Sequence, residues 1–306
     1  MSFKIVFMGT PEFSIPALES LIKNKFNIAC VYTQPPQKSK RGQKINPSPI
    51  EEFSKKNEIN FRNPSNLDTN EELKIFKELS PDIVVVVAYG QIIPESFLKT
   101  ARLSFINIHA SLLPKWRGAA PIQRAIMNGD EKVGVSIMKI EKKLDSGPVL
   151  LKKELNLDQN MIYGEIEKKL SIIGADLLIE SLKKIESGEA KFIDQVQAEA
   201  TYARKIDKTE TKINWNLEAN KVIRHVHALS PNPGAWFEYK NERFKVLRAK
   251  QTMVSGKPGT HLDENLTIGC KSNSIQILEI QRQGKNKQTT KEFLLGKKIN
   301  KGSMLI

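Results

Sequence analysis

Two polar side chains end an apolar run in this 306-residue chain, and their spacing could support acyl-transfer chemistry. The run Phe105–Ile108 consists mostly of residues that favour β-strands. Asn107 and His109 are two residues apart, so on a strand both project from the same face. An amide donor and an imidazole would then lie together where a strand ends, which is where open α/β sheets bind ligands. Taken alone, this spacing is more typical of a polar strand end without chemistry.

An isolated acid in a later loop could complete such a site. Asp145 lies between Leu144 and Ser146, ahead of a Gly-Pro turn, and its carboxylate could orient the His109 ring and stabilise its charged form. The alternative is an ordinary turn residue. Asn107 could donate to a developing oxyanion, which is worth about 3 kcal/mol in comparable sites. His109 could share that role and relay a proton. Because no Ser or Cys nucleophile is evident, direct transfer is expected rather than a covalent intermediate.

Other common chemistries lack their sequence signals. The first predicted turn reads Gly9-Thr10-Pro11-Glu12, without the further glycines of a dinucleotide-binding loop and with an acid where a pyrophosphate would lie. His225 and His227 are two apart on a predicted helix and therefore point in different directions. We expect neither a bound dinucleotide nor a metal ion.

The elements that must position these residues alternate between strands and helices. The near-continuous apolar run Asp82–Ala88 is typical of a central parallel strand that is covered on both faces. The alternation predicts an α/β fold: a Rossmann-like, doubly wound, mostly parallel sheet. Further strands are predicted at 4–8, 28–32, 59–61, 133–140 and 149–155, and helices at 14–23, 47–56, 69–79, 120–127 and 161–185.

The pattern changes after about residue 190. Short β-prone runs separated by Gly and Pro turns follow one helix at 219–228, which predicts a small β-barrel. We therefore expect a domain at 1–189, a linker at 190–208 and a second domain at 209–306.

The charge suggests a polyanionic partner. The net charge is +14, and residues 207–306 carry +9 of it. The segment 33–44 contains no acidic residue and four basic ones, which would suit RNA phosphates; a solvated loop is the alternative. These four residues are Lys38, Lys40, Arg41 and Lys44.

The remaining composition predicts a cytoplasmic protein. The longest apolar run, Ile83–Tyr89, is too short to cross a membrane, and the N-terminal residues lack the features of a signal peptide. The only two cysteines are far apart, which fits a reducing compartment.

Several motifs together resemble the 10-formyltetrahydrofolate formyltransferases. The central block is Asn107-x-His109 followed by Ser111-Leu112-Leu113-Pro114, with Leu144–Pro148 downstream. The opening Met8–Phe13, the segment Tyr202–Ile206 and the stretch Pro231–Ala235 also resemble this family, so the likeness covers most of the chain.

The resemblance implies a reaction and a set of roles. It implies formyl transfer from 10-formyltetrahydrofolate to the amino group of methionine on initiator tRNA, by a monomer whose second domain is an OB-like barrel that binds tRNA. The implied catalytic residues are Asn107, His109 and Asp145. The implied folate-binding residues are Ser111, Leu112, Leu113 and Pro114, with Val87, Ala88, Tyr89 and Gly90 lining the pterin pocket, and the basic segment would read the tRNA acceptor stem with Arg41 as its leading contact.

Two other functions remain as alternatives. A formyltransferase acting on a sugar nucleotide or purine precursor would need neither the basic segment nor a cationic second domain. A non-catalytic RNA-binding protein would not need Asn107, His109 and Asp145 together.

Overall fold

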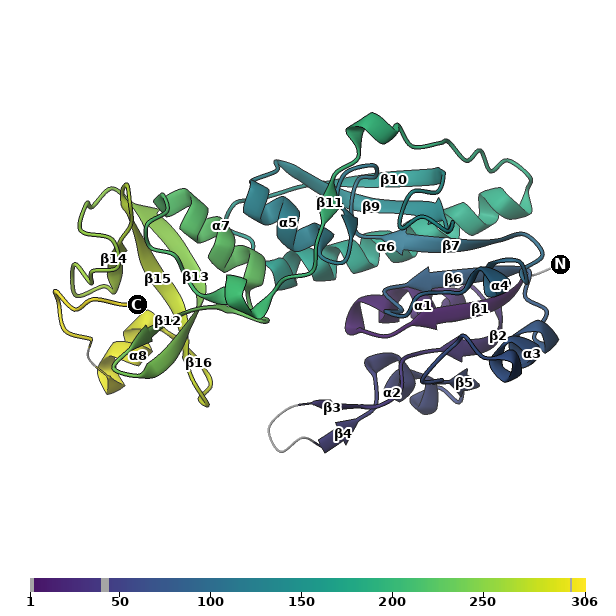
Figure 1. Ribbon diagram of the computed structural model, residues 1–306, viewed down its shortest axis with the longest axis horizontal. Coiled ribbons are helices and arrows are strands. Elements are labelled where there is room, and N and C mark those ends of the chain that lie inside the picture. The colour runs from purple at the N-terminus through teal and green to yellow at the C-terminus, as the bar shows by residue number, and fades with distance from the viewer. Residues whose placement is uncertain (1–2, 40–43, 298) are drawn as a thin grey trace. The chain divides into compact units, whose positions relative to one another are not determined.

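The computed structural model describes residues 3–39, 44–297 and 299–306 (Figure 1). Internal contacts divide the chain into two compact units, and each is discontinuous in sequence. Unit 1 comprises Met1–Gly118, Gly134–Leu155 and Lys168–Tyr202. Unit 2 comprises Ala119–Val133, Asn156–Glu167 and Ala203–Ile306. Two short segments from the middle of the chain thus belong with the C-terminal third.

The central sheet has seven strands in the order β10-β9-β7-β6-β1-β2-β5. Neighbouring strands from β5 to β7 are parallel, and β9 runs antiparallel to β7. The predicted mostly parallel, doubly wound sheet is confirmed. The strands are β1 (Lys4–Gly9), β2 (Asn27–Tyr32), β5 (Phe61–Arg62), β6 (Ile83–Val87), β7 (Ser104–His109), β9 (Lys132–Lys139) and β10 (Val149–Asn156).

The direction of winding reverses beside β1. The chain builds outward from β1 through β2 to β5 and then returns to place β6 and β7 on the other side. The register pairs Gly9 with Val87 and Val86 with Asn107, so β1, β6 and β7 end at one edge of the sheet. Where the winding reverses, the loops after the two adjacent strands run in opposite directions and open a crevice. α/β proteins bind their ligands in this crevice, at the carboxyl ends of the strands.

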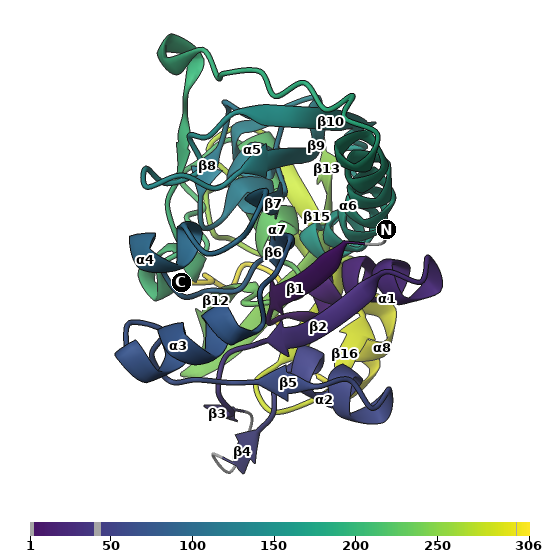
Figure 2. The same ribbon diagram turned by 90° about the vertical axis from the view of Figure 1, so that its right-hand side faces the viewer.

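Helices cover both faces of this sheet (Figure 2). On one face, Phe76 of α3 and Phe97 of α4 pack with Val84, Val86 and Phe105 in a buried cluster. On the other face, α1 and the later part of α6 lie against the sheet. The helices are α1 (Ile15–Lys23), α2 (Pro49–Lys56), α3 (Asn70–Glu78), α4 (Glu95–Leu98) and α6 (Tyr163–Glu186).

Two short strands that were not predicted from the sequence lie in and beside the basic segment. β3 (Gln37–Ser39) and β4 (Lys44–Asn46) pair antiparallel. These strands have three residues each and little apolar patterning, so periodicity gave no signal for them.

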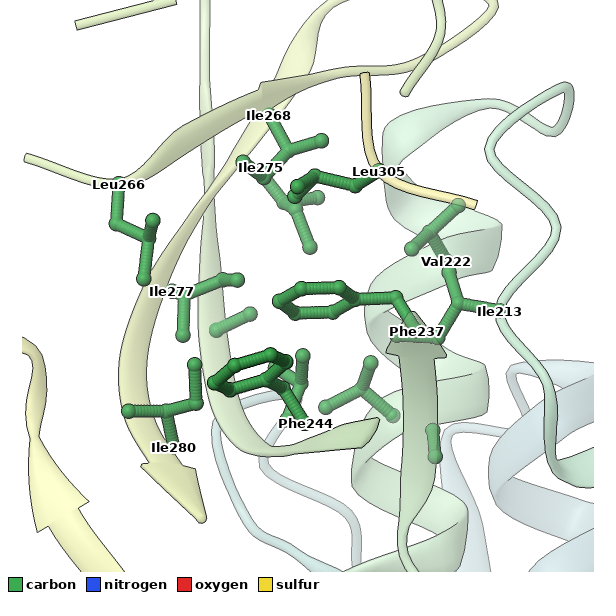
Figure 3. Packing of buried hydrophobic residues seen from close by; sticks show 14 of the residues in the cluster. Ile213, Val222, Phe237, Phe244, Leu266, Ile268, Ile275, Ile277, Ile280 and Leu305 are labelled. Atoms are coloured by element: carbon green, nitrogen blue, oxygen red, sulfur yellow. The ribbon is translucent and has the colours of Figure 1, made fainter. Parts of the chain in front are cut away.

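Unit 2 is built on a five-stranded antiparallel sheet in which β16 joins the path β12-β13-β15-β14. In its core, the rings of Phe237 and Phe244 stack at 5.4 Å, with Ile275, Ile277 and Leu305 close by (Figure 3). The predicted second, antiparallel β domain is confirmed. Its elements are α5 (Pro121–Asn128), α7 (Ala219–Leu229), β12 (Ala235–Tyr239), β13 (Glu242–Thr252), β14 (Thr267–Gly269), β15 (Ser274–Arg282), β16 (Lys287–Thr289) and α8 (Thr290–Gly296).

Two very short strands, β8 (Arg117–Gly118) and β11 (Tyr202–Ala203), pair with each other. Among the helices of residues 3–39, 44–297 and 299–306, none has the length and apolar character needed to cross a bilayer.

Candidate active site

Asn107 and His109 lie at the C-terminal end of strand β7. Phe105 of the same strand packs against the α3–α4 face, and side chains alternate along a strand, so Asn107 and His109 share that face. His109 is buried and Asn107 is half-buried. Within the described residues, the Asn107 side-chain amide has no hydrogen-bond partner. Its donors are therefore available to another molecule at this edge.

The His109 ring lies between two oxygens. Its Nε2 is 3.0 Å from the Trp116 carbonyl oxygen, and its Nδ1 is 3.7 Å from Oδ2 of Asp145. The first distance is a hydrogen bond, whereas the second is an ion-pair distance that is too long for a direct hydrogen bond. Both ring nitrogens of His109 therefore face an oxygen atom of the protein.

The Asp145 loop has a constrained backbone. Asp145 has φ of 48°, in the left-handed region that non-glycine residues seldom adopt. Its Oδ2 accepts a 2.8 Å hydrogen bond from the Gly118 N–H. A Cβ on Gly147 would lie 2.1 Å from the Lys139 carbonyl oxygen, so only glycine allows this close approach. The carboxylate is thus aimed at His109 by contacts outside its own loop.

The segment Ser111–Pro114 is fixed against β9 and β10. Ser136 Oγ donates to the Ser111 carbonyl at 2.7 Å and accepts from the Leu113 N–H at 3.1 Å. The Lys152 ammonium donates to the Leu113 carbonyl, and the Leu113 side chain is buried. Ser111 is also buried and donates to the Lys115 carbonyl at 2.6 Å, while Leu112 and Pro114 are half-buried. This predicted folate segment is a rigid part of unit 1.

The predicted pterin-lining residues continue β6 at the same edge. Val87 and Tyr89 are buried, whereas Ala88 and Gly90 are exposed with φ of 47° and 84°. The Tyr89 carbonyl accepts hydrogen bonds from Thr10 Oγ1 at 2.7 Å and from Nε2 of Gln34, which follows β2, at 3.2 Å. Burial raises the pKa of the Tyr89 phenol well above its usual range, so this group is neutral at physiological pH. The four residues therefore form part of the edge that also holds Asn107.

The predicted tRNA contacts are only partly described. Lys38 and Lys44 belong to the short strands β3 and β4. Lys40 and Arg41 lie outside the described residues.

Within the described part of the chain, no group of three His, Cys, Asp or Glu residues could hold a metal ion. His225 and His227, which the sequence analysis left without a role, contact backbone carbonyls of unit 2.

A set of contacts around the buried Arg117 side chain was not predicted from the sequence. This side chain is completely buried, and its Nε and Nη2 donate to Gln195 Oε1 at 3.1 and 2.7 Å. Its Nη1 donates to Gln197 Oε1 at 2.9 Å. Arg117 and Gln195 are 78 residues apart, so no local motif connects them.

Family models match nearly the whole chain. Residues 3–182 match the model described as formyl transferase, and residues 205–298 match the formyl transferase C-terminal domain. The chain belongs to the formyl transferase family. The resemblance inferred from the sequence motifs is confirmed.

Formyl transferases of two kinds are among its relatives. The chain is 49% identical over 307 residues to the methionyl-tRNA formyltransferase of Pelagibacter ubique (strain HTCC1062), which covers 100% of this chain and 99% of that relative. A solved methionyl-tRNA formyltransferase from Clostridium thermocellum has a TM-score of 0.57 at 17% identity, covering 82% of this chain and 94% of the other.

The N-formyltransferase from Helicobacter canadensis, solved in complex with folinic acid and dTDP-3-aminofucose, has a TM-score of 0.69 at 18% identity and covers 92% of this chain and 99% of the other. At these identities the two structural likenesses establish the formyl transferase fold alone.

Proposed function

We propose that this formyl transferase moves a formyl group from 10-formyltetrahydrofolate to the amino group of methionyl-tRNA, giving N-formylmethionyl-tRNA. The observation that carries the proposal is the set of Asn107, His109 and Asp145 at the carboxyl edge of the parallel sheet. The full-length similarity to a methionyl-tRNA formyltransferase supports the choice of acceptor.

The chemistry requires an amine to attack the formyl carbon as its free base. Negative charge then builds on the formyl oxygen, the attacking nitrogen loses a proton, and the departing folate nitrogen gains one. The Asn107 amide can donate to the oxyanion, and the His109 ring can stabilise the same charge. Asp145 would hold the His109 ring through the Nδ1 side, at the 3.7 Å separation observed here.

The two segments that flank this set fit the role of a folate site. Ser111–Pro114 is held on β9 and β10 by Ser136 and Lys152, and Val87–Gly90 ends the adjacent strand β6. A rigid wall on each side would orient the formyl donor with little loss of conformational freedom.

The charge distribution supports a tRNA acceptor. The C-terminal hundred residues carry +9, and the basic segment brings Lys38, Lys40, Arg41 and Lys44 within seven positions of one another. Neutralising phosphates with such residues supplies much of the affinity of RNA-binding proteins. We propose that both regions contact tRNA and that the enzyme acts as a cytoplasmic monomer, organised as the catalytic region 1–189, the connecting segment 190–208 and the tRNA-binding region 209–306.

A formyl-transfer assay tests the proposal. The protein is incubated with labelled 10-formyltetrahydrofolate and initiator methionyl-tRNA, with elongator methionyl-tRNA and an amino-sugar nucleotide as alternative acceptors. We expect label on initiator tRNA only. Label on the sugar nucleotide would replace the proposed acceptor, and binding of tRNA without any transfer would indicate a non-catalytic protein.

Variants at the site separate catalysis from binding. His109→Ala and Asp145→Ala should each lower turnover by about two decades or more, because general acid–base groups contribute on that scale. Affinity for tRNA, measured by filter binding, should stay close to that of the unaltered protein. A comparable loss of tRNA affinity would contradict the catalytic assignment.

A further inference from the structure

One three-residue segment, Trp116–Gly118, contacts His109 at one end and Asp145 at the other. The Trp116 carbonyl is hydrogen-bonded to His109, and the Gly118 N–H donates to the Asp145 carboxylate. Between them, the Arg117 side chain turns inward and is completely buried. The segment Trp116–Gly118 therefore contacts both ionisable members of the proposed catalytic set.

The buried Arg117 acts on the Asp145 loop through Gln195. Gln195 Oε1 accepts two hydrogen bonds from Arg117, while Gln195 Nε2 donates to the carbonyls of Asp145 at 2.9 Å and Gly147 at 2.7 Å. One buried amide thus joins the guanidinium to two carbonyls of the loop.

The direction of this amide is determined by its partners. Arg117 can only donate, so it requires the oxygen of Gln195 on its side. The nitrogen must then face the two loop carbonyls, which can only accept. Reversing the amide would oppose donors to donors and acceptors to acceptors, so Arg117 fixes which groups Gln195 offers to the loop.

The Asp145 loop needs such a restraint. A non-glycine residue with φ of 48° costs on the order of 1–3 kcal/mol and persists only where neighbouring groups hold it. The segment that supplies Gln195 is itself fastened to the site: Thr201 Oγ1 accepts from the Trp116 N–H and the Thr201 carbonyl accepts from the Arg117 N–H, both at 2.9 Å.

We propose that Arg117 and Gln195 are positioning residues that hold the Asp145 carboxylate in place against His109. This inference rests on the proposed formyl-transfer function. Neither side chain need touch a substrate, since both act through the backbone of the Asp145 loop.

The deciding variant is Gln195→Glu. Glutamate keeps the size of glutamine and keeps an acceptor for Arg117, and it adds the opposite charge. It loses the Nε2 donors and presents an oxygen to the carbonyls of Asp145 and Gly147. We expect thermal stability equal to or above that of the unaltered protein, with kcat lowered 10- to 100-fold, because a displacement of about 1 Å at a catalytic group can cost about 100-fold.

Gln197→Glu is the matched control. Gln197 accepts from the same guanidinium and is itself exposed, and its side chain donates to the Gln195 carbonyl rather than to the Asp145 loop. This variant introduces the same charge beside Arg117 and should leave kcat within about twofold of the unaltered value. KM for folate and for tRNA should be unchanged in both glutamate variants.

A double-mutant cycle with Asp145→Ala distinguishes a positioning role from a general structural role, because only a positioning role makes the losses in kcat non-additive. If Gln195 acts through Asp145, adding Gln195→Glu to Asp145→Ala should lower kcat no further. Additive losses, or unaltered kcat in Gln195→Glu, would overturn the proposal. Should Gln195→Glu fail to fold, Arg117→Lys makes the same test, since lysine keeps the charge but loses the fork that orients the amide. Absence of transfer by the unaltered protein would instead refute the proposed function.

Discussion

Replacing Asn107 with leucine should lower kcat strongly and leave the free energy of unfolding almost unchanged. The Asn107 amide is half-buried and has no hydrogen-bond partner within residues 3–39, 44–297 and 299–306. Its removal therefore leaves no protein group unsatisfied. Leucine has a similar volume, so the free energy of unfolding should change by less than about 1 kcal/mol.

The kinetic loss should be far larger. Removing one donor from an oxyanion site typically costs about 2.7–4 kcal/mol, or a factor of about 100–1,000 in kcat. Asn107→Asp should be worse, because the carboxylate has no donor and repels the developing charge. At a separation of about 4 Å and an effective dielectric constant of about 20, that repulsion is about 4 kcal/mol. We therefore expect kcat to fall in the order Asn, Leu, Asp.

Single-turnover transfer with saturating formyl donor and acceptor measures this order without interference from product release. Thermal unfolding of the same preparations measures stability, and a fluorescence titration measures folate binding. Two results would refute the reasoning: kcat of Asn107→Leu within tenfold of the unaltered value, or a kinetic loss matched by a loss of fold. Equal activity of the Leu and Asp variants would show that no negative charge develops near this side chain.

Three other perturbations have expected outcomes. The hydrogen bonds from Arg124 hold the pKa of Glu210 at about 2, below its ordinary 4.5, so the pair stabilises unit 2 fully above pH 4.5 and less as the pH falls toward 2. Glu210→Gln should flatten the decline of the urea midpoint between pH 5 and pH 3; an unchanged decline would contradict this. Gly134→Ala would place a Cβ 2.4 Å from Leu112 Cδ2 and 2.4 Å from a carbonyl oxygen of β10, so it should destabilise the fold by about 1–3 kcal/mol and raise KM for folate. An unaltered KM would argue against a folate role for that segment. Arg41→Ala should reduce the slope of log affinity for tRNA against log salt by about one, and an unchanged slope would exclude a phosphate contact there.

Repeating patterns accounted for most of the fold. The apolar run at 82–88 became β6, and the helix predicted at 69–79 became α3 with Thr69 as its N-cap. These predictions succeeded because a covered strand and a capped amphipathic helix each leave a signal within a few neighbouring residues. The hairpin β3–β4 left no such signal, since its pairing depends on strands of three residues each.

The candidate catalytic residues could be named from the sequence, but the hydrogen bonds that hold the Asp145 loop could not. Spacing predicted that Asn107 and His109 share one face of a strand, and Asp145 was a candidate as an acid in a loop after a strand. The resemblance to the formyl transferases was needed to join the three residues into one site. The buried hydrogen bonds from Arg117 to Gln195 could not be predicted. The two residues are far apart in the sequence, and neither belongs to a periodic pattern or a local motif that would signal the contact. The segment 190–208 was predicted to be a connection, and in the structure its residues Gln195 and Thr201 also contact the Asp145 loop and Trp116.

The position of Gln195 along the chain has a consequence for synthesis and for turnover of the protein. A ribosome delivers Asn107, His109 and Asp145 first, and the glutamine that holds the Asp145 loop follows 50 residues later. The strands of the central sheet can therefore pair in the nascent chain before Gln195 is available to hold the Asp145 carboxylate against His109. A protease that cuts in the exposed turn Gln197–Glu199 would break the covalent link between Gln195 and Thr201, so that only the side-chain hydrogen bonds of Gln195 would still tie it to the Asp145 loop.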